Sequence, residues 1–348
     1  MESLAVKYRP KTFDDVLGQE YTKEILESQV KTGRTRNAYL FCGPSGDGKT
    51  TMARIFANMV NEGQGSPIEI DGASNNGVDN VRELIDEARS RSLDSKYKFV
   101  IVDECHQLTQ QAWSAFLKCL EEPPEYTKFV FCTTDPQKIP STILNRLMRF
   151  DFKKVPAKDI AERLKRICSN EGLSDYDDAC DYIAKLSNGG VRDAISMLEK
   201  CSEYDRRISM DVVCNVLGTN MFGPMFELTN AILDGNKNAV LGVMNGFKKL
   251  GVESIKDFMT EYVSFLLDLT KYCVFHDLSD TSLPESLLLP KSKGDTLCIQ
   301  YTIGVENAPS VFAKLTQLVN QVRADTRNDD SPCDTATIGL MSLCEVSL

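Results

Sequence analysis

Residues 43–50 match the phosphate-binding pattern G-x-x-x-x-G-K-[ST]. The apolar residues 38–42 before them predict a buried strand, and residues 52–57 after them predict a helix. In this context glycines let backbone amides surround a polyphosphate, and the helix N-terminus adds positive potential. We expect Lys49 to reach the β- and γ-phosphates and the Thr50 hydroxyl to bind Mg²⁺. The pattern predicts a nucleoside triphosphate site made by Gly43, Pro44, Ser45, Gly46, Asp47, Gly48, Lys49, Thr50 and Thr51.

Two consecutive acids, Asp103 and Glu104, end a second predicted strand over residues 99–103. We expect Asp103 to hold magnesium opposite Thr50, and Glu104 to orient or deprotonate the attacking water. A solvent-facing acid pair is the alternative, and the upstream phosphate loop counts against it. The pair therefore predicts hydrolysis as well as binding.

His106 extends the acid pair to D-E-x-H, a sequence that helicases also carry. Such helicases have two tandem motor domains, whereas the β pattern here ends near residue 152 and leaves room for one sheet. His106 is one of 2 histidines and has no partner at metal-ligand spacing, so we expect no ligand role for it.

Three polar residues follow along the chain. Thr133 ends a predicted strand over residues 128–133, which would place it beside Asp103, within reach of the γ-phosphate or the water. Arg146 ends a short helical segment away from the phosphate loop, where it suits a finger supplied to a neighbouring subunit. Arg192 begins a helix after two glycines and could reach back to the γ-phosphate. Taken alone, each arginine is more often a surface charge.

A parallel sheet must align these strand ends. Up to about residue 155, short apolar runs alternate with helical patterns, which is typical of α/β folds. The predicted strands cover residues 38–42, 68–71, 99–103, 128–133 and 149–152. The clearest helix between them covers residues 110–121 and can be capped by Thr109.

Beyond Pro156 only helical patterns continue. We expect an α/β nucleotide-binding domain at 1–155, a small helical domain at 156–219 and an all-α domain at 220–348. In the small domain the hydrophobic pattern predicts helices at 160–168, 177–186 and 192–201. In the last domain it predicts longer amphipathic helices, one of them at 311–323, and a loop at 277–293.

The composition narrows the functional classes. A chain of 348 residues with 42% hydrophobic and 26% charged residues is an ordinary globular composition. A net charge of -10 argues against general nucleic-acid binding, so any DNA contact must be local. The 12 cysteines form no C-x-x-C pair, which favours reduced thiols in a cytoplasmic protein. No signal-peptide pattern or membrane span is expected, since charges interrupt the most hydrophobic predicted helix.

Together the motifs resemble the AAA+ ATPases, and specifically the gamma/tau subunits of bacterial DNA polymerase III clamp loaders. The likeness is dense over residues 1–220 and beyond them is mainly one of helical character and length. The segments that carry it are residues 7–13, 16–20, 69–79, 116–125, 133–140 and 149–153. This combination is far more specific than a phosphate loop.

The resemblance implies an AAA+ domain, a helical lid at 156–219 and a helical collar that builds a five-subunit ring. It implies ATP and Mg²⁺ as cofactors, with a sliding clamp, primer–template DNA and other loader subunits as partners. The ATP-bound loader would open the clamp and seat it on a primer–template junction, and hydrolysis would release it. It assigns Thr133 as first sensor, Arg146 as the finger in trans, Arg192 as second sensor, and Tyr8, Arg9, Pro10 and Val16 to the adenine and ribose pocket.

Ser74, Asn75, Asn76 and Gly77 precede a predicted helix at 78–89, whose free amides could hold a DNA phosphate. In the family this region faces DNA. The same residues could also cap the helix, and both roles can hold together.

The chain departs from the family in three places. The four-cysteine zinc module of cellular members is replaced by a short polar link at residues 61–66, so we expect no zinc. The finger usually lies in Ser-Arg-Cys, but here it lies in Asn145-Arg146-Leu147. The long extension by which tau binds polymerase and helicase is not in this sequence, which would suit a phage-encoded loader.

Two alternatives stay open. Another AAA+ DNA-repair or fork-maintenance ATPase is one, although a branch-migration motor would need a basic winged helix that the acidic residues 221–348 do not offer. A non-hydrolysing scaffold subunit is the other. Such subunits often lose the lysine or the acid pair, whereas Lys49, Asp103 and Glu104 are all present.

Overall fold

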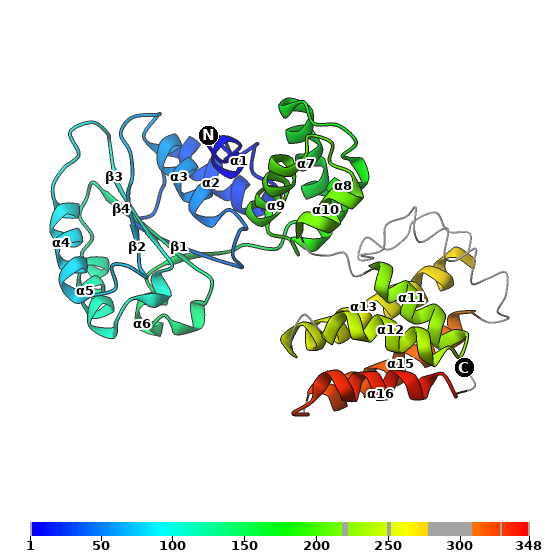
Figure 1. Ribbon diagram of the computed structural model, residues 1–348. Helices are drawn as coiled ribbons and strands as arrows, with labels where there is room; N and C mark the ends of the chain where they lie inside the picture. Colours follow the sequence, from blue (N-terminus) through cyan, green and yellow to red (C-terminus); the bar gives the residue numbers. More distant parts are fainter. Residues whose placement is uncertain (1, 218–221, 249–251, 278–307, 328, 347–348) are drawn as a thin grey trace. The chain divides into compact units, whose positions relative to one another are not determined.

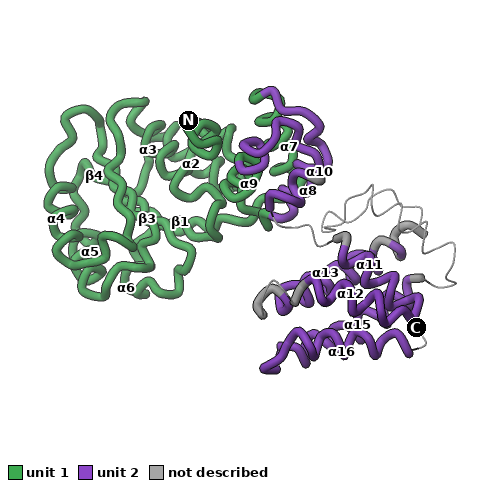
Figure 2. Tube along the Cα trace, viewed as in Figure 1, with its two compact units in different colours: residues 1–171, 187–199 green, residues 172–186, 200–348 purple. Residues whose placement is uncertain are grey.

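The computed structural model describes residues 2–217, 222–248, 252–277, 308–327 and 329–346. The chain divides into two compact units, Met1–Glu171 with Ser187–Glu199, and Gly172–Leu186 with Lys200–Leu348 (Figure 2). The three-domain division stays a prediction. The predicted loop at 277–293 lies outside the described residues apart from Asp277, which ends a helix.

The first unit contains a parallel sheet with the strand order β2-β3-β4-β1-β5 (Figure 1). Every predicted strand is present and correct to within one residue at each end. The strands β1 and β4 are buried along their whole length, as expected when helices cover both faces of a parallel sheet. The strands are β1 Ala38–Cys42, β2 Ile68–Asp71, β3 Lys98–Asp103, β4 Thr127–Thr133 and β5 Met148–Asp151.

Alternating side chains of the strands enter two separate cores. Leu40 of β1 belongs to the core with Trp113 and Phe116, whereas its neighbour Phe41 belongs to the core with Phe56. The first core packs α4 and α5 against the sheet, and the second packs α2 and α3. The helices of this unit are α1 Leu4–Lys7, α2 Glu20–Thr32, α3 Lys49–Val60, α4 Val78–Arg89, α5 Gln110–Glu121, α6 Ser141–Leu144, α7 Ala157–Glu171 and the first part of α9 Val191–Tyr204, with short 3₁₀ turns η1 Cys105–Gln107 and η2 Pro136–Lys138.

The predicted cap of α5 is confirmed. The Thr109 hydroxyl oxygen accepts a hydrogen bond from the amide of Ala112 at 3.2 Å, which satisfies one of the free donors of the first turn. Both ends of α4 and α5 also lie where the sequence predicts them.

The second unit is helical in its described part. Phe258, Tyr262 and Leu266 of α13 are fully buried together with Phe312 and Leu315 of α15. The predicted helix at 311–323 is longer in the structure, where it covers α15. The helices are α8 Asp177–Leu186, α10 Met210–Leu217, α11 Phe222–Leu233, α12 Lys237–Lys248, α13 Val252–Asp277, α15 Ala308–Arg327 and α16 Pro332–Leu343. Among the described helices, none combines the length and apolarity that a membrane crossing requires.

Candidate active site

The phosphate loop connects the end of β1 to the first residue of α3. Gly46 and Gly48 have φ angles of 81° and 88°, a region that glycine enters without steric cost, and this lets the loop curl. Lys49 is only 6% exposed. Its Nζ donates to the carbonyl oxygens of Gly43 at 2.8 Å and Pro44 at 2.6 Å. The ammonium group is therefore held inside the loop that it is predicted to serve.

The acid pair lies directly opposite the loop. The Thr50 hydroxyl donates to Asp103 Oδ2 at 2.7 Å, so the two expected magnesium ligands touch. A hydroxyl and a carboxylate are the oxygen ligands that Mg²⁺ prefers, so the pair fits this ion. Among the described residues, no group of three or more His, Cys, Asp and Glu side chains gathers into a further metal site.

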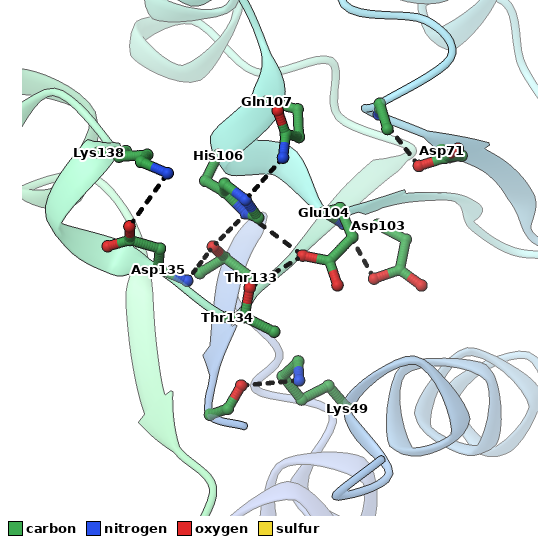
Figure 3. Close-up of polar contacts among 12 residues, drawn as sticks. Lys49, Asp71, Asp103, Glu104, His106, Gln107, Thr133, Thr134, Asp135 and Lys138 are labelled. Carbon is green, nitrogen blue, oxygen red and sulfur yellow. Dashed lines mark hydrogen bonds and ion pairs between the residues drawn. The ribbon is translucent and has the colours of Figure 1, made fainter. Parts of the chain in front are cut away.

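Glu104 has a strained backbone and a defined side-chain position. Its φ of 43° and ψ of 42° place it in the left-handed region, which costs a non-glycine residue about 1–2 kcal/mol. Its Oε2 accepts from the Thr134 hydroxyl at 3.3 Å and lies 3.2 Å from His106 Nδ1 (Figure 3). Strain of this kind persists only where the surroundings hold the residue, and it is common at functional sites.

Thr133 reaches the acid pair through His106. Thr133 is fully buried, and its Oγ1 lies 3.1 Å from His106 Nδ1 while accepting from the amide of Asp135 at 3.0 Å. His106 thus contacts two predicted site residues at once. The sequence presents His106 as part of a D-E-x-H box without a metal-ligand partner, and it does not predict this contact. Its place two residues after Glu104 is the only signal that could have indicated it.

A cavity of about 580 Å³ opens beside the loop, within the size range of small-molecule sites. Arg9, which is predicted to be in the nucleotide pocket, has a lowered pKa because it is partly buried and because Arg54 and Arg192 lie near it. Arg54 is in turn held by Glu69 through two hydrogen bonds of 2.6 and 2.7 Å. The predicted residues that line the cavity are Tyr8, Arg9, Pro10, Val16, Ser45, Gly46, Asp47, Gly48, Lys49, Thr50, Thr51, Asp103, Glu104 and Arg192.

Hydrogen bonds join the N-terminal segment to α7 and α9, and all three contribute residues to the lining of this cavity. The Tyr8 hydroxyl donates to Glu171 Oε1 at 2.5 Å, and the Tyr8 carbonyl oxygen accepts from Arg163 Nη2 at 3.0 Å. The backbone amide of Leu4 donates to Glu199 of α9 at 2.9 Å. These contacts fix the segment that carries the predicted adenine residues. Local sequence patterns do not predict these contacts, since they join positions more than 150 residues apart.

Asp47 is the least satisfied side chain of the loop. It is 3% exposed, and neither carboxylate oxygen has a hydrogen-bond partner among the described residues. Burial raises the pKa of Asp47 to about 6; Lys49 and Lys154 oppose the shift, and Asp193 adds to it. The loop therefore contains an acid whose charge is costly near neutral pH.

The predicted residues that do not line the cavity are Gly43, Pro44, Thr133, Arg146 and residues 74–77. Arg146 donates to Glu121 Oε1 at 2.6 Å and to the Thr142 carbonyl oxygen at 2.5 Å. The Ser74 hydroxyl donates to Asp71 Oδ2 at 2.8 Å. The predicted cap of α4 by Ser or Asn is wrong, because the cap position is Gly77 and no side chain accepts from the first turn. Asp71 holds Ser74 instead.

The class of protein follows from the fold. The Thermotoga maritima RuvB Holliday junction branch migration motor matches with a TM-score of 0.53 and 23% identity, over 65% of this chain and 79% of that chain. At this identity the likeness establishes the fold alone. The chain has an α/β domain of the AAA+ fold followed by helical regions, as the sequence predicts.

The family follows from the sequence comparisons. The family model "DNA polymerase III, delta subunit" matches residues 67–156. DNA polymerase III subunit tau/gamma of Haemophilus influenzae is 37% identical over 67% of this chain, and DNA polymerase III subunit tau of Bacillus subtilis is 34% identical over 76%. The chain spans 37% and 51% of the lengths of these relatives. This chain belongs to the gamma/tau family of DNA polymerase III subunits.

Proposed function

We propose that this chain is the ATP-hydrolysing motor subunit of a clamp loader, which opens a sliding clamp and loads it on primer–template DNA. The observation that carries the proposal is the direct contact between Thr50 and Asp103, with Glu104 adjacent, at the mouth of the cavity. Membership of the gamma/tau family supports the clamp-loading role. Hydrolysis then releases the clamp.

The chain's residues divide the work of hydrolysis. Thr50 and Asp103 would hold Mg²⁺, which neutralises charge on the phosphates. Lys49 exchanges its loop carbonyl partners for phosphate oxygens, which are stronger, charge-assisted acceptors. Glu104 accepts the proton of the attacking water. Arg192 stabilises charge on the γ-phosphate from the start of α9.

Arg146 acts on the nucleotide of a neighbouring subunit in a ring. It does not line the cavity of its own chain, and its side chain is 34% exposed. An arginine supplied in trans stabilises transition-state charge without belonging to the phosphate loop that it serves. Each subunit then supplies the phosphate loop and the acid pair of its own site, and the arginine of its neighbour's site.

Residues 74–77 bind a DNA phosphate at the start of α4. No side chain caps the first turn of this helix, so its amides remain available to an anion. Such a local contact is compatible with a net charge of -10, and its affinity falls as salt rises.

The test is the ATPase rate of the assembled complex, measured alone, with primed DNA, with the cognate clamp and with both. We expect DNA and clamp together to give the largest stimulation. A complex that turns over ATP without responding to either ligand overturns clamp loading and favours another AAA+ ATPase. A complex that binds ATP but never hydrolyses it indicates a scaffold subunit.

A further inference from the structure

His106 contacts predicted site residues at the ends of two neighbouring strands, Glu104 after β3 and Thr133 of β4. Its side chain is 8% exposed and does not line the cavity. One nitrogen, Nδ1, lies 3.2 Å from Glu104 Oε2 and 3.1 Å from Thr133 Oγ1 (Figure 3). The ring therefore bridges the end of β3 and the end of β4 from behind the reacting groups.

The neighbours of the ring determine which nitrogen carries the proton. The Gln107 amide nitrogen lies 3.0 Å from His106 Nε2. The Glu104 carboxylate that faces Nδ1 can only accept, so the neutral ring carries its proton on Nδ1. Nε2 then accepts from the Gln107 amide.

This proton arrangement also defines what Thr133 can do. Its oxygen already accepts from the Asp135 amide at 3.0 Å and faces Nδ1–H as a second acceptor contact. Its own hydroxyl proton is then not needed by the histidine. The Thr133 hydroxyl proton therefore stays available to another acceptor.

We propose that His106 is a positioning residue that holds the Glu104 carboxylate and the Thr133 hydroxyl in one hydrogen-bonded unit. The inference rests on the proposed ATPase function. It adds a physical connection between Thr133, the proposed sensor, and Glu104, the proposed general base. Glu104 needs such support, because its backbone is in the strained left-handed region and its other side-chain partner, Thr134, lies at 3.3 Å. Water cannot replace the histidine easily at a site that is 8% exposed.

The test compares substitutions at this position in the assembled complex. His106→Asn keeps a donor at the place of Nδ1, His106→Gln moves the donor toward the place of Nε2, and His106→Leu removes it. We expect His106→Leu and His106→Gln to lower kcat about 10- to 100-fold, the effect of losing one hydrogen bond to a charged group. His106→Asn should recover most of the rate, and KM should change less than about threefold in all variants.

Two controls separate positioning from folding. Gln107→Ala removes an exposed partner whose bond water can replace, so kcat should stay within about threefold of wild type. In a Glu104→Gln background, His106→Leu should cause no further loss. Thermal melting and fluorescent-nucleotide binding check that each variant folds; if His106→Leu does not, the Asn and Gln pair still decides.

The outcomes distinguish the two levels of the argument. Equal rates for His106→Asn and His106→Gln, or a wild-type rate for His106→Leu, overturn the role of His106 and leave the ATPase intact. A wild-type complex without turnover overturns the proposed function itself, and the inference falls with it.

Discussion

The phosphate loop and the segment after α6 that carries Arg146 differ in how exposed their charged groups are. At the loop, Lys49 is 6% exposed, and Thr50 is already in contact with Asp103. After α6, Arg146 is 34% exposed and pairs with Glu121, which is 48% exposed. An exposed ion pair of this kind contributes about 0–1 kcal/mol, so it can be exchanged at little cost.

This difference shows which functions one chain can build alone. Groups that we propose bind the triphosphate are preorganised inside the fold, where burial strengthens their interactions. Groups that would act on a neighbouring subunit or on DNA remain exposed, because they must be able to change partners. The variants below should affect these two kinds of group in different ways.

The largest effects belong to the loop and the acid pair. Lys49→Ala should weaken ATP binding at least about 100-fold, because a buried charge-assisted contact to phosphate is lost. Glu104→Gln keeps the shape of the side chain but not its basicity, so binding should survive while turnover falls about 10²- to 10⁴-fold. Fluorescent-nucleotide titration and phosphate release measure the two quantities. Loss of binding in Glu104→Gln would contradict the assignment of separate roles.

Arg146→Ala tests the other side of the comparison. Nucleotide affinity of the isolated chain should not change, since Arg146 does not line its cavity, whereas ATPase of the assembled ring should fall about 10³-fold or more. The matched control is Arg149→Ala, which removes another exposed arginine, paired with Asp151. A normal rate in the Arg146 variant removes the trans-finger assignment.

Asp47 gives the loop a pH-dependent stability. Its folded pKa of about 6 is above its ordinary 3.8, so the folded state binds the proton more tightly. The stabilisation is present below about pH 4 and is lost as pH rises to about 6. Asp47→Asn removes the buried charge and should stabilise the nucleotide-free protein by about 2–3 kcal/mol at pH 7. Melting curves should converge near pH 4; a constant difference across pH would contradict a titrating carboxyl.

Sequence patterns were sufficient where local chemistry sets the structure. Each strand of the sheet is a short apolar run, and Thr109 places the start of α5. The patterns failed at the start of α4, where two local arrangements compete. The cap position is Gly77, and Asp71, three residues before Ser74, accepts the hydrogen bonds of Ser74 and of the Ala73 amide.

In the candidate site, the contacts that could not be predicted join residues far apart in the sequence. The phosphate loop and the acid pair are contiguous motifs, so their types and spacing could be recognised before the fold was known. The contact of His106 with Thr133 joins residues 27 positions apart and depends on where the η1 turn lies against β4. The tie between Tyr8 and Glu171 spans 163 positions and has no local signal.

The smallest predicted effect concerns residues 74–77. Asn76→Asp places a negative charge beside the uncapped amides at the start of α4 with almost no change in size. Primed-DNA affinity should fall about fivefold, with a salt dependence reduced by about one phosphate contact. Asn58→Asp makes the same charge change on an exposed position of α3 and should leave DNA binding unchanged. Equal losses in both variants would indicate that overall charge, rather than the start of α4, controls DNA affinity.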